Sequence, residues 1–191
     1  DFAFWQAFTQ TLDEHRASAP AGEEFFSFGE VYDADATLLS PYVRDTEMDS
    51  VLDFAFQSST TNWARGYTAR GMSGLFAADD YYTTPDSSAG DLPTFVGNHD
   101  MGRAAMMLAG SGYSGDELQQ RVELTNELMF LTRGQPVVYY GDEQGFVGRG
   151  GDKAARQDMF ATQVEAWAEQ DGVDGEPLGD EDHFDTQAPL Y

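Results

Sequence analysis

Apolar residues recur along the chain in two patterns. Residues 2–17 carry large apolar side chains at helical spacing, with Trp5, Phe8 and Leu12 on one face, and the Pro-Ala-Gly of residues 20–22 stops the run. Short, mainly apolar and aromatic runs of strand length follow at residues 25–32, 51–56, 92–97 and 137–140. The pattern therefore predicts an N-terminal helix followed by four strands.

Helical segments are predicted between these strands. Residues 57–78 have helical content, weakened by three glycines, whereas residues 33–49 are mostly polar and resemble a loop. Ser114 and Glu117 form a capping-box pair ahead of a clear helix, which Gly134 ends. After the fourth strand we expect a helix near residues 158–170 and then an acidic, loop-like tail over residues 171–191.

The order of the predicted elements indicates the class of fold. A helix followed by three strand–helix units and a fourth strand argues for parallel strands with crossover helices. The candidate strands are apolar throughout, as expected for a parallel sheet covered on both faces. A doubly wound sheet and a barrel both fit this pattern. No Gly-rich dinucleotide loop follows the first strand.

Composition and charge narrow the range of partners. The 191 residues are 41% hydrophobic and 14% aromatic, which is enough for one sizeable core. The net charge of −24 repels nucleic acid and anionic membranes, so neither is an expected partner. The absence of cysteine excludes disulfides and cysteine-ligated metals. No apolar run approaches the roughly 20 residues of a membrane span, and no signal peptide is visible.

Acidic side chains follow three of the predicted strands. Glu30 comes at the end of the first, Asn98, His99 and Asp100 follow the third, and residues 142–143 (Asp-Glu) follow the fourth. Carboxylates gathered at the C-terminal ends of parallel strands are the usual layout of a (β/α)8 active site. Cleavage of a glycosidic bond needs such a set, because one carboxyl protonates the leaving oxygen and others handle the oxocarbenium-like charge. Residues 142–143 fit a simple turn equally well.

Three segments resemble, in order and spacing, the alpha-amylase family of glycoside hydrolases. Residues 26–32 (Phe-Ser-Phe-Gly-Glu-Val-Tyr) resemble its general-acid segment, residues 95–100 (Phe-Val-Gly-Asn-His-Asp) the segment after strand seven, and residues 134–145 the strand-eight segment. The resemblance implies an α/β fold in which residues 1–170 form the C-terminal half of a (β/α)8 TIM barrel, with strands five to eight. Residues 171–191 would be an acidic tail leading to a further C-terminal region.

The resemblance also assigns roles to residues. Glu30 would be the general acid/base, and Asp100 would be a second carboxylate that bonds sugar hydroxyls and steadies the transition state. His99 would hydrogen-bond the same sugar, and Asn98 would help to hold the strand end. Two further candidates for substrate contact are Tyr32 and Arg103. The segment at residues 156–158 corresponds to a loop that often lines the site in the family.

The family's nucleophile is an Asp at the end of strand four, with an Arg two residues before it and a His after it. No such segment occurs here, so we expect the nucleophile just upstream of Asp1, in a longer parent protein. A retaining mechanism needs two carboxyls about 5 Å apart. The isolated chain is therefore expected to be inactive, although its parent would be a retaining hydrolase of α-glucans or maltooligosaccharides.

Two other functions fit the sequence. A barrel homologue that has lost catalysis could serve as a binding or transporter-accessory subunit, as some relatives do. An unrelated α/β enzyme could carry the Asn-His-Asp of residues 98–100 by chance. The residue at the nucleophile position of the parent would separate the first of these from a hydrolase, and closure of the strands as half of a barrel would exclude the second.

Cofactors and partners complete the expectations. No cofactor or metal site is predicted in the chain. Asp33 and Asp35 could suggest calcium, but the pair lacks the further ligands and the Gly of a calcium loop, so a structural calcium is considered only for the parent. Half a barrel leaves two sheet edges and an apolar face uncovered, which predicts a homo-oligomer. An extracellular or periplasmic location is expected, because many relatives degrade polymeric glucans outside the cell.

Overall fold

The computed structural model describes residues 1–18, 20 and 26–191. Parts of the predicted helix stop (residues 21–22) and the first residue of the first predicted strand (25) lie outside the described residues. The helices are α1 (Phe2–Ser18), α2 (Ala36–Arg44), α3 (Phe54–Ala64), α4 (Arg70–Ala77), α5 (Ala104–Ala109), α6 (Gly115–Leu131) and α7 (Glu165–Ala168). The strands are β1 (Phe28–Gly29), β2 (Ser50–Val51), β3 (Pro93–Thr94) and β4 (Gln135–Pro136), and the 3-10 helices are η1 (Asp79–Tyr82), η2 (Ala89–Asp91) and η3 (Asp152–Ala155).

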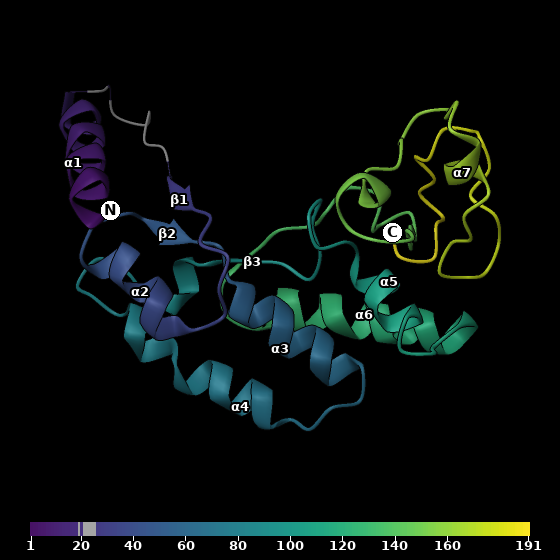
Figure 1. Ribbon diagram of the computed structural model, residues 1–191, viewed down its shortest axis with the longest axis horizontal. Coiled ribbons are helices and arrows are strands. Elements are labelled where there is room, and N and C mark those ends of the chain that lie inside the picture. Colours follow the sequence, from purple (N-terminus) through teal and green to yellow (C-terminus); the bar gives the residue numbers. More distant parts are fainter. Residues whose placement is uncertain (19, 21–25) are drawn as a thin grey trace.

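The strands pair in parallel. Phe28 of β1 lies opposite Ser50 of β2, and Pro93 of β3 lies opposite Gln135 of β4. A backbone hydrogen bond of 3.0 Å from Asp53 N to Pro93 O joins the end of β2 to β3. Each parallel neighbour is reached through a helical crossover, with the helices α2 to α6 along one side of the strands (Figure 1). The predicted parallel strands with crossover helices are confirmed.

The regular strands are shorter than the apolar runs predicted, and two of the runs were assigned wrongly. The run at residues 51–56 is only partly extended, because the side chain of Asp53 accepts a 2.8 Å hydrogen bond from Phe56 N and starts helix α3 there. The fourth strand lies before the predicted residues 137–140, because β4 pairs with β3 at residues 135–136. Beyond β4 the pairing continues with one backbone hydrogen bond, from Val137 N to Thr94 O at 2.8 Å. A strand ends where its neighbour stops offering backbone partners, and apolar composition alone does not locate that point.

Helix α2 lies where the sequence predicted a polar loop. Asp35 caps it, accepting a 2.8 Å hydrogen bond from Thr37 N, and Pro41 lies inside it. Its buried positions include Ala36, Leu39 and Val43, which recur at helical spacing. The helical spacing of these few apolar residues was missed because acidic residues flank them and a proline lies among them. Helix α5 was also not predicted, and the helix expected near residues 158–170 is reduced to α7.

The predicted capping box at the start of α6 does not form. Ser114 is the N-cap residue, but its side chain makes no capping hydrogen bond. The Glu117 carboxylate instead accepts hydrogen bonds of 3.1 and 2.9 Å from Arg121, one turn along the helix. Helix α6 therefore begins at the predicted place without the predicted contact.

Three buried clusters hold the elements together. The first contains Leu39 of α2 and Val51 of β2, and the second contains Phe56 of α3 and Met129 of α6. The third joins α5 and α6 to the acidic tail through Val173, with Leu190 packed against it. The predicted division at residue 170 therefore coincides with no break in the packing. Among the described residues, no helix is long and apolar enough to cross a membrane.

Candidate functional site

The predicted catalytic carboxylates lie at one edge of the strands. Glu30 follows β1 directly, and Asp100 lies in the turn that follows β3. Because the strands run parallel, both lie toward the same, C-terminal edge. Both side chains are exposed to solvent. The edge therefore presents two carboxylates, as the sequence predicted, with β2 between their strands.

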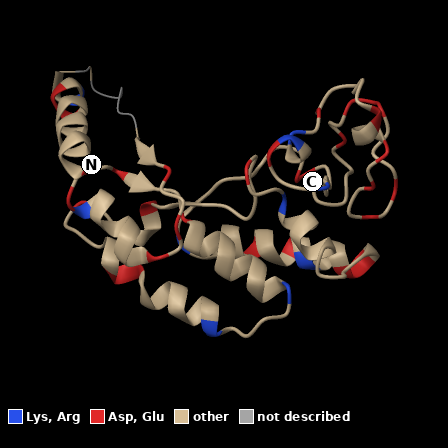
Figure 2. Ribbon diagram, viewed as in Figure 1, with Lys and Arg blue, Asp and Glu red and all other residues tan. Residues whose placement is uncertain are grey.

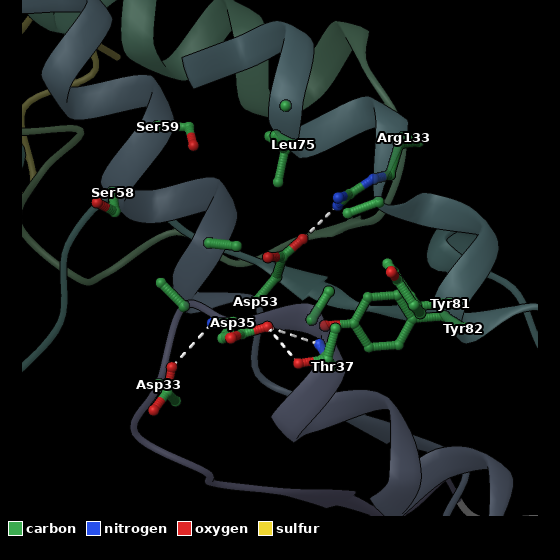
Figure 3. A pocket seen from close by; sticks show the side chains of 15 residues that line it. Asp33, Asp35, Thr37, Asp53, Ser58, Ser59, Leu75, Tyr81, Tyr82 and Arg133 are labelled. Atoms are coloured by element: carbon green, nitrogen blue, oxygen red, sulfur yellow. Dashed lines mark hydrogen bonds and ion pairs between the residues drawn. The ribbon is translucent and has the colours of Figure 1, made fainter. Parts of the chain in front are cut away.

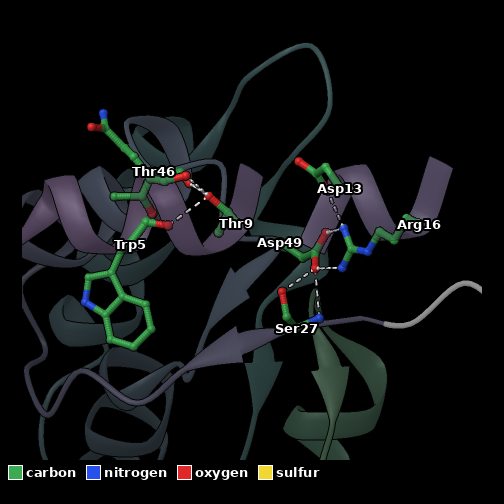
Figure 4. A network of polar contacts seen from close by, with 8 residues as sticks. Trp5, Thr9, Asp13, Arg16, Ser27, Thr46 and Asp49 are labelled. Atoms are coloured by element: carbon green, nitrogen blue, oxygen red, sulfur yellow. Dashed lines mark hydrogen bonds and ion pairs between the residues drawn. The ribbon is translucent and has the colours of Figure 1, made fainter. Parts of the chain in front are cut away.

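Helix α1 holds the strand that carries Glu30. Arg16 Nη1 donates to Asp49 Oδ1 at 3.1 Å, and Asp49 Oδ2 accepts from Ser27 N at 2.8 Å and Ser27 Oγ at 2.6 Å (Figure 4). Burial acts to raise the pKa of Asp49, but the hydrogen bonds from Arg16 and Ser27 outweigh it and hold that pKa below its ordinary value. Since Ser27 immediately precedes β1, this network sets the position of the strand whose end carries Glu30. The sequence offered no signal for it, because Asp49 lay in a predicted loop.

A row of aromatic rings connects the two strand ends. Tyr32 packs edge-on against Phe54, with ring centroids 4.8 Å apart, and Phe54 packs against Phe95 at 5.1 Å. The Tyr32 side chain is 71% exposed, whereas the other two rings are buried. The exposed ring of Tyr32 therefore rests on rings that follow β2 and β3, and its contact with a substrate stays a prediction. The separation of these residues in the sequence hid this arrangement.

Asn98 shapes the turn that presents His99 and Asp100. Its Oδ1 accepts hydrogen bonds from Asp100 N at 3.0 Å and Met101 N at 2.7 Å. The backbones of Asn98 and Gly102 bond each other in both directions, and Gly102 has a φ of +94°, which favours glycine. His99 and Asp100 each remain 50% exposed, with His99 Nε2 at 3.4 Å from Asp100 Oδ1. The predicted role of Asn98 in holding the strand end agrees with this geometry.

A second loop covers this turn. Asp152 N donates to Asp100 O at 3.1 Å, and a Cβ at Gly151 would lie 2.2 Å from that same carbonyl oxygen, so only glycine fits there. The guanidinium of Arg156 lies 3.5 Å from Asp100 Oδ1 and 3.2 Å from Asp152 Oδ1. Of residues 156–158, Arg156 is therefore the one placed beside a predicted catalytic carboxylate.

The expectation that Arg103 contacts a substrate is wrong for this structure. Its side chain is 0% exposed and forms a 2.6 Å ion pair with Asp142. It also donates to Tyr140 O at 2.7 Å and to Ala155 O at 3.3 Å, and its Nε donates to Gln157 at 3.1 Å. From the sequence, an arginine just beyond an exposed turn is expected at the surface. Arg103 instead points inward and connects the loop after β3 to the loop after β4.

The acidic pair after β4 is a turn, and its two members differ. Asp142 is buried against Arg103, and burial raises its pKa to about 6 although the guanidinium acts in the opposite direction. Glu143 accepts a 2.8 Å hydrogen bond from Gly141 N, which closes the turn locally. Both contacts hold the turn together, which is the structural role that the sequence allowed for residues 142–143.

The two acidic residues considered for calcium, Asp33 and Asp35, accept hydrogen bonds from backbone N–H groups (Figure 3). Asp33 Oδ1 accepts from Asp35 N at 2.8 Å, and Asp35 caps helix α2 through Thr37. Within residues 1–18, 20 and 26–191, no three His, Cys, Asp or Glu side chains are placed to hold a metal ion together. The donor set at these residues does not fit calcium.

Comparisons with known proteins agree with the fold. Residues 1–183 match the family described as "Alpha amylase, catalytic domain". The chain is 45% identical over 194 residues to an alpha-amylase of Streptomyces lividans, covering 100% of this chain and 21% of that protein. It is 31% identical to a cyclomaltodextrin glucanotransferase of Niallia circulans, over 79% of this chain and 20% of that enzyme.

Solved structures show the same fold. An alpha-amylase from H. orenii superposes with a TM-score of 0.66 at 20% identity, over 97% of this chain and 33% of that one. An alpha-amylase from Geobacillus thermoleovorans superposes with a TM-score of 0.67 at 21% identity, over 81% and 32% of the two chains. The predicted half of a (β/α)8 barrel is confirmed, and the chain spans about a fifth of the length of its curated relatives.

Proposed function

This chain belongs to the alpha-amylase family of glycoside hydrolases, and from that premise we propose that it supplies half of the active site of a retaining hydrolase. The substrate would be an α-glucan or a maltooligosaccharide. The observation that carries the proposal is the exposure of Glu30 and Asp100 at one edge of parallel strands, beside the open ring of Tyr32. A carboxyl that is exposed at this edge is open to contact with a glycosidic oxygen.

The roles follow from the chemistry of the bond. Glu30 donates a proton to the leaving oxygen and then takes one from water, while Asp100 binds sugar hydroxyls as positive charge develops on the ring. His99 hydrogen-bonds the same sugar from beside Asp100, and the Tyr32 ring packs against it. The guanidinium of Arg156 lies 3.5 Å from Asp100 Oδ1, on the side of the loop that follows β4.

The isolated chain is proposed to be inactive. Retention needs a nucleophilic carboxylate about 5 Å from the acid. The segment that carries the nucleophile in the family, with an Arg two residues before the Asp and a His after it, does not occur in these 191 residues. Asp100 is assigned to sugar binding by its place after β3, and Asp142 is buried in an ion pair, so neither replaces the nucleophile.

The same half barrel is proposed to self-associate in isolation. The outer edges of β1 and β4 have no strand partner among the described residues, and Phe28, Val137 and Val138 are exposed there. A second copy would cover these edges and remove apolar surface from water. Light scattering after size exclusion should give a mass of two chains or more. A monomer that binds no apolar dye would contradict this proposal.

The hydrolase proposal is tested in the full-length protein. Glu30→Gln keeps the size of the side chain but cannot donate a proton, so hydrolysis of a nitrophenyl maltooligosaccharide should fall by about 100-fold or more. NMR of the first product should show retained anomeric configuration. Unchanged turnover in Glu30→Gln would refute the role of Glu30, and a full-length protein that binds the oligosaccharide without cleaving it would be a binding subunit instead.

A further inference from the structure

The covering loop, residues 148–157, lies directly against the turn that carries Asp100. Asp152 N donates a 3.1 Å hydrogen bond to Asp100 O. At the end of the turn, a Cβ on Gly102 would lie 2.9 Å from Gly150 O, so the two backbones meet without room for a side chain. Backbones packed in this way move together, because neither can shift without a clash or a gap. The position of Asp100 therefore depends on where the covering loop is held.

Arg103 anchors the covering loop from its buried side. The guanidinium is 0% exposed and donates from Nη2 to Ala155 O at 3.3 Å and from Nε to Gln157 Oε1 at 3.1 Å. Its Nη1 donates to Asp142 Oδ1 at 2.6 Å, in the turn after β4. Arginine carries its donors in a fixed, planar fork, so the acceptors around it decide how it is oriented. Among these acceptors, Gln157 supplies a side chain from the covering loop itself.

The orientation of the Gln157 amide is fixed from both sides. The residue is 2% exposed, and while its Oε1 accepts from Arg103, its Nε2 donates to Gln170 Oε1 at 2.9 Å. Because arginine has donors only, the oxygen of the Gln157 amide must face it. Gln170, which follows α7, in turn donates from Nε2 to Ala166 O at 3.3 Å, so its own oxygen faces Gln157. Turning the Gln157 amide round would lose both of its hydrogen bonds, which is costly for a buried group.

Gln157 and Arg156 point to opposite sides of the covering loop. Gln157 faces Arg103 in the interior, whereas the Arg156 side chain is 47% exposed and lies 3.5 Å from Asp100 Oδ1. Gly148 closes the inner side, since its φ is +77° and a Cβ there would lie 3.1 Å from Gln157 Nε2. Two neighbouring residues thus join a buried anchor to an exposed cation beside Asp100, and a movement of one moves the other.

We propose that Gln157 is a positioning residue for the reaction: by fixing Arg103, it holds the covering loop against the turn that carries Asp100. Gln157 is buried, so it touches no substrate and acts through Arg103. The inference rests on the proposed function, because it concerns the sugar-binding role given there to Asp100. A displacement of about 1 Å caused far from the chemistry can cost an enzyme about 100-fold in rate, so a loosened loop should be measurable.

The first test follows the covering loop directly, by hydrogen exchange in the full-length protein. Gln157→Leu keeps a buried side chain of similar size but offers Arg103 no acceptor. Amides of residues 150–156 should then exchange about tenfold faster, because the Asp152 N–H loses the support that keeps it against Asp100 O. Gln170→Leu removes the hydrogen bond on the other side of Gln157 and is the matched control. It should leave exchange at these residues unchanged.

The second test is kinetic and separates positioning from stability. Gln157→Leu should raise KM for a nitrophenyl maltooligosaccharide by about fivefold, since a displaced Asp100 binds sugar less well. Partial unfolding alone would lower the apparent kcat and leave KM unchanged, because the molecules that stay folded bind substrate as before. Gln157→Glu keeps an acceptor for Arg103 and loses only the donor to Gln170, so its KM should stay within about twofold of the wild type. Gln170→Leu should lower the melting temperature and leave KM unchanged.

Arg103→Lys tests the same link from its other end. It keeps a positive charge opposite Asp142, but a single ammonium cannot reach both Ala155 and Gln157. KM should rise as in Gln157→Leu, which keeps the inference testable where Gln157→Leu does not fold. The inference is overturned if exchange and KM match the wild type in these two variants, or if Gln170→Leu raises KM as much as Gln157→Leu does.

A failure of the hydrolase proposal is distinguishable from a failure of this inference. A full-length protein that binds the oligosaccharide without cleaving it refutes the first, and its Kd then replaces KM in the same comparison of variants. Hydrolysis that depends on Glu30 but not on Gln157 refutes only the second. Hydrogen exchange needs no substrate and decides how the covering loop is held in either case.

Discussion

The guanidinium of Arg103 lies 2.6 Å from Oδ1 of Asp142, and both residues are buried. The same arginine also lies over the ring of Tyr139 at 4.6 Å. Because Ala155 and Gln157 both accept hydrogen bonds from Arg103, the residue between them, Arg156, is held where it faces Asp100. One buried side chain thus connects the turn that carries a predicted catalytic carboxylate to the loop that covers it.

Removing Arg103 should strongly destabilise the chain. Arg103→Met leaves Asp142 as a buried charge without a partner, which typically costs about 3–5 kcal/mol of unfolding free energy. Urea denaturation measures this loss. Arg156→Met removes an exposed ion pair and should cost less than about 1 kcal/mol, so equal losses in the two variants would contradict the buried role of Arg103.

The stability of the chain should depend on pH through Asp142. Its pKa of about 6 in the folded state lies above the value of about 3.9 in an unfolded chain, so the folded state binds more protons between these values. The contribution of Asp142 to stability is therefore full below about pH 4 and is lost as the pH rises through about 6. Urea midpoints measured across this window should show the trend in the wild type and lose it in Asp142→Asn.

Asp49 should change the stability of the chain with pH in the direction opposite to that of Asp142. Its pKa is held below the ordinary value, so its contribution is present above the unfolded pKa of about 3.9 and is lost as the pH falls further. Asp49→Asn should destabilise the chain at neutral pH, and the difference from the wild type should shrink in acid. Asp13→Asn, on the exposed partner of Arg16, is the control and should show little change at either pH.

Salt should stabilise the chain. Thirty-four acidic and ten basic residues give a net charge of −24, and acidic positions, red in Figure 2, are spread from α1 to the C-terminal tail. Screening of this self-repulsion should raise the melting temperature as sodium chloride increases toward about 1 M. The variant Asp180→Asn/Glu181→Gln, at two exposed positions, should show a shallower increase. A melting temperature independent of salt would show that the charges do not repel measurably.

Local sequence alone determined much of this protein. The alternation of helical segments and apolar runs predicted parallel strands with crossover helices. It could do so because the spacing of side chains along a helix and along a strand follows from backbone geometry. Glu30 and Asp100 each follow an apolar run directly in the sequence. Their places at strand ends could therefore be predicted before any tertiary contact was known. Helix α1 was predicted within a residue for the same reason.

Tertiary structure decided the rest, because the deciding partners are far apart in the sequence. Arg103 is buried only because Asp142 and Gln157, 39 and 54 residues away, complete its hydrogen bonds. Gln157 is fixed only because Arg103 lies on one side of it and Gln170, from the segment after α7, on the other. The strands end where neighbouring backbones stop pairing. Local sequence therefore determined which groups could do chemistry, and only long-range packing decided which of them face solvent and which hold the chain together.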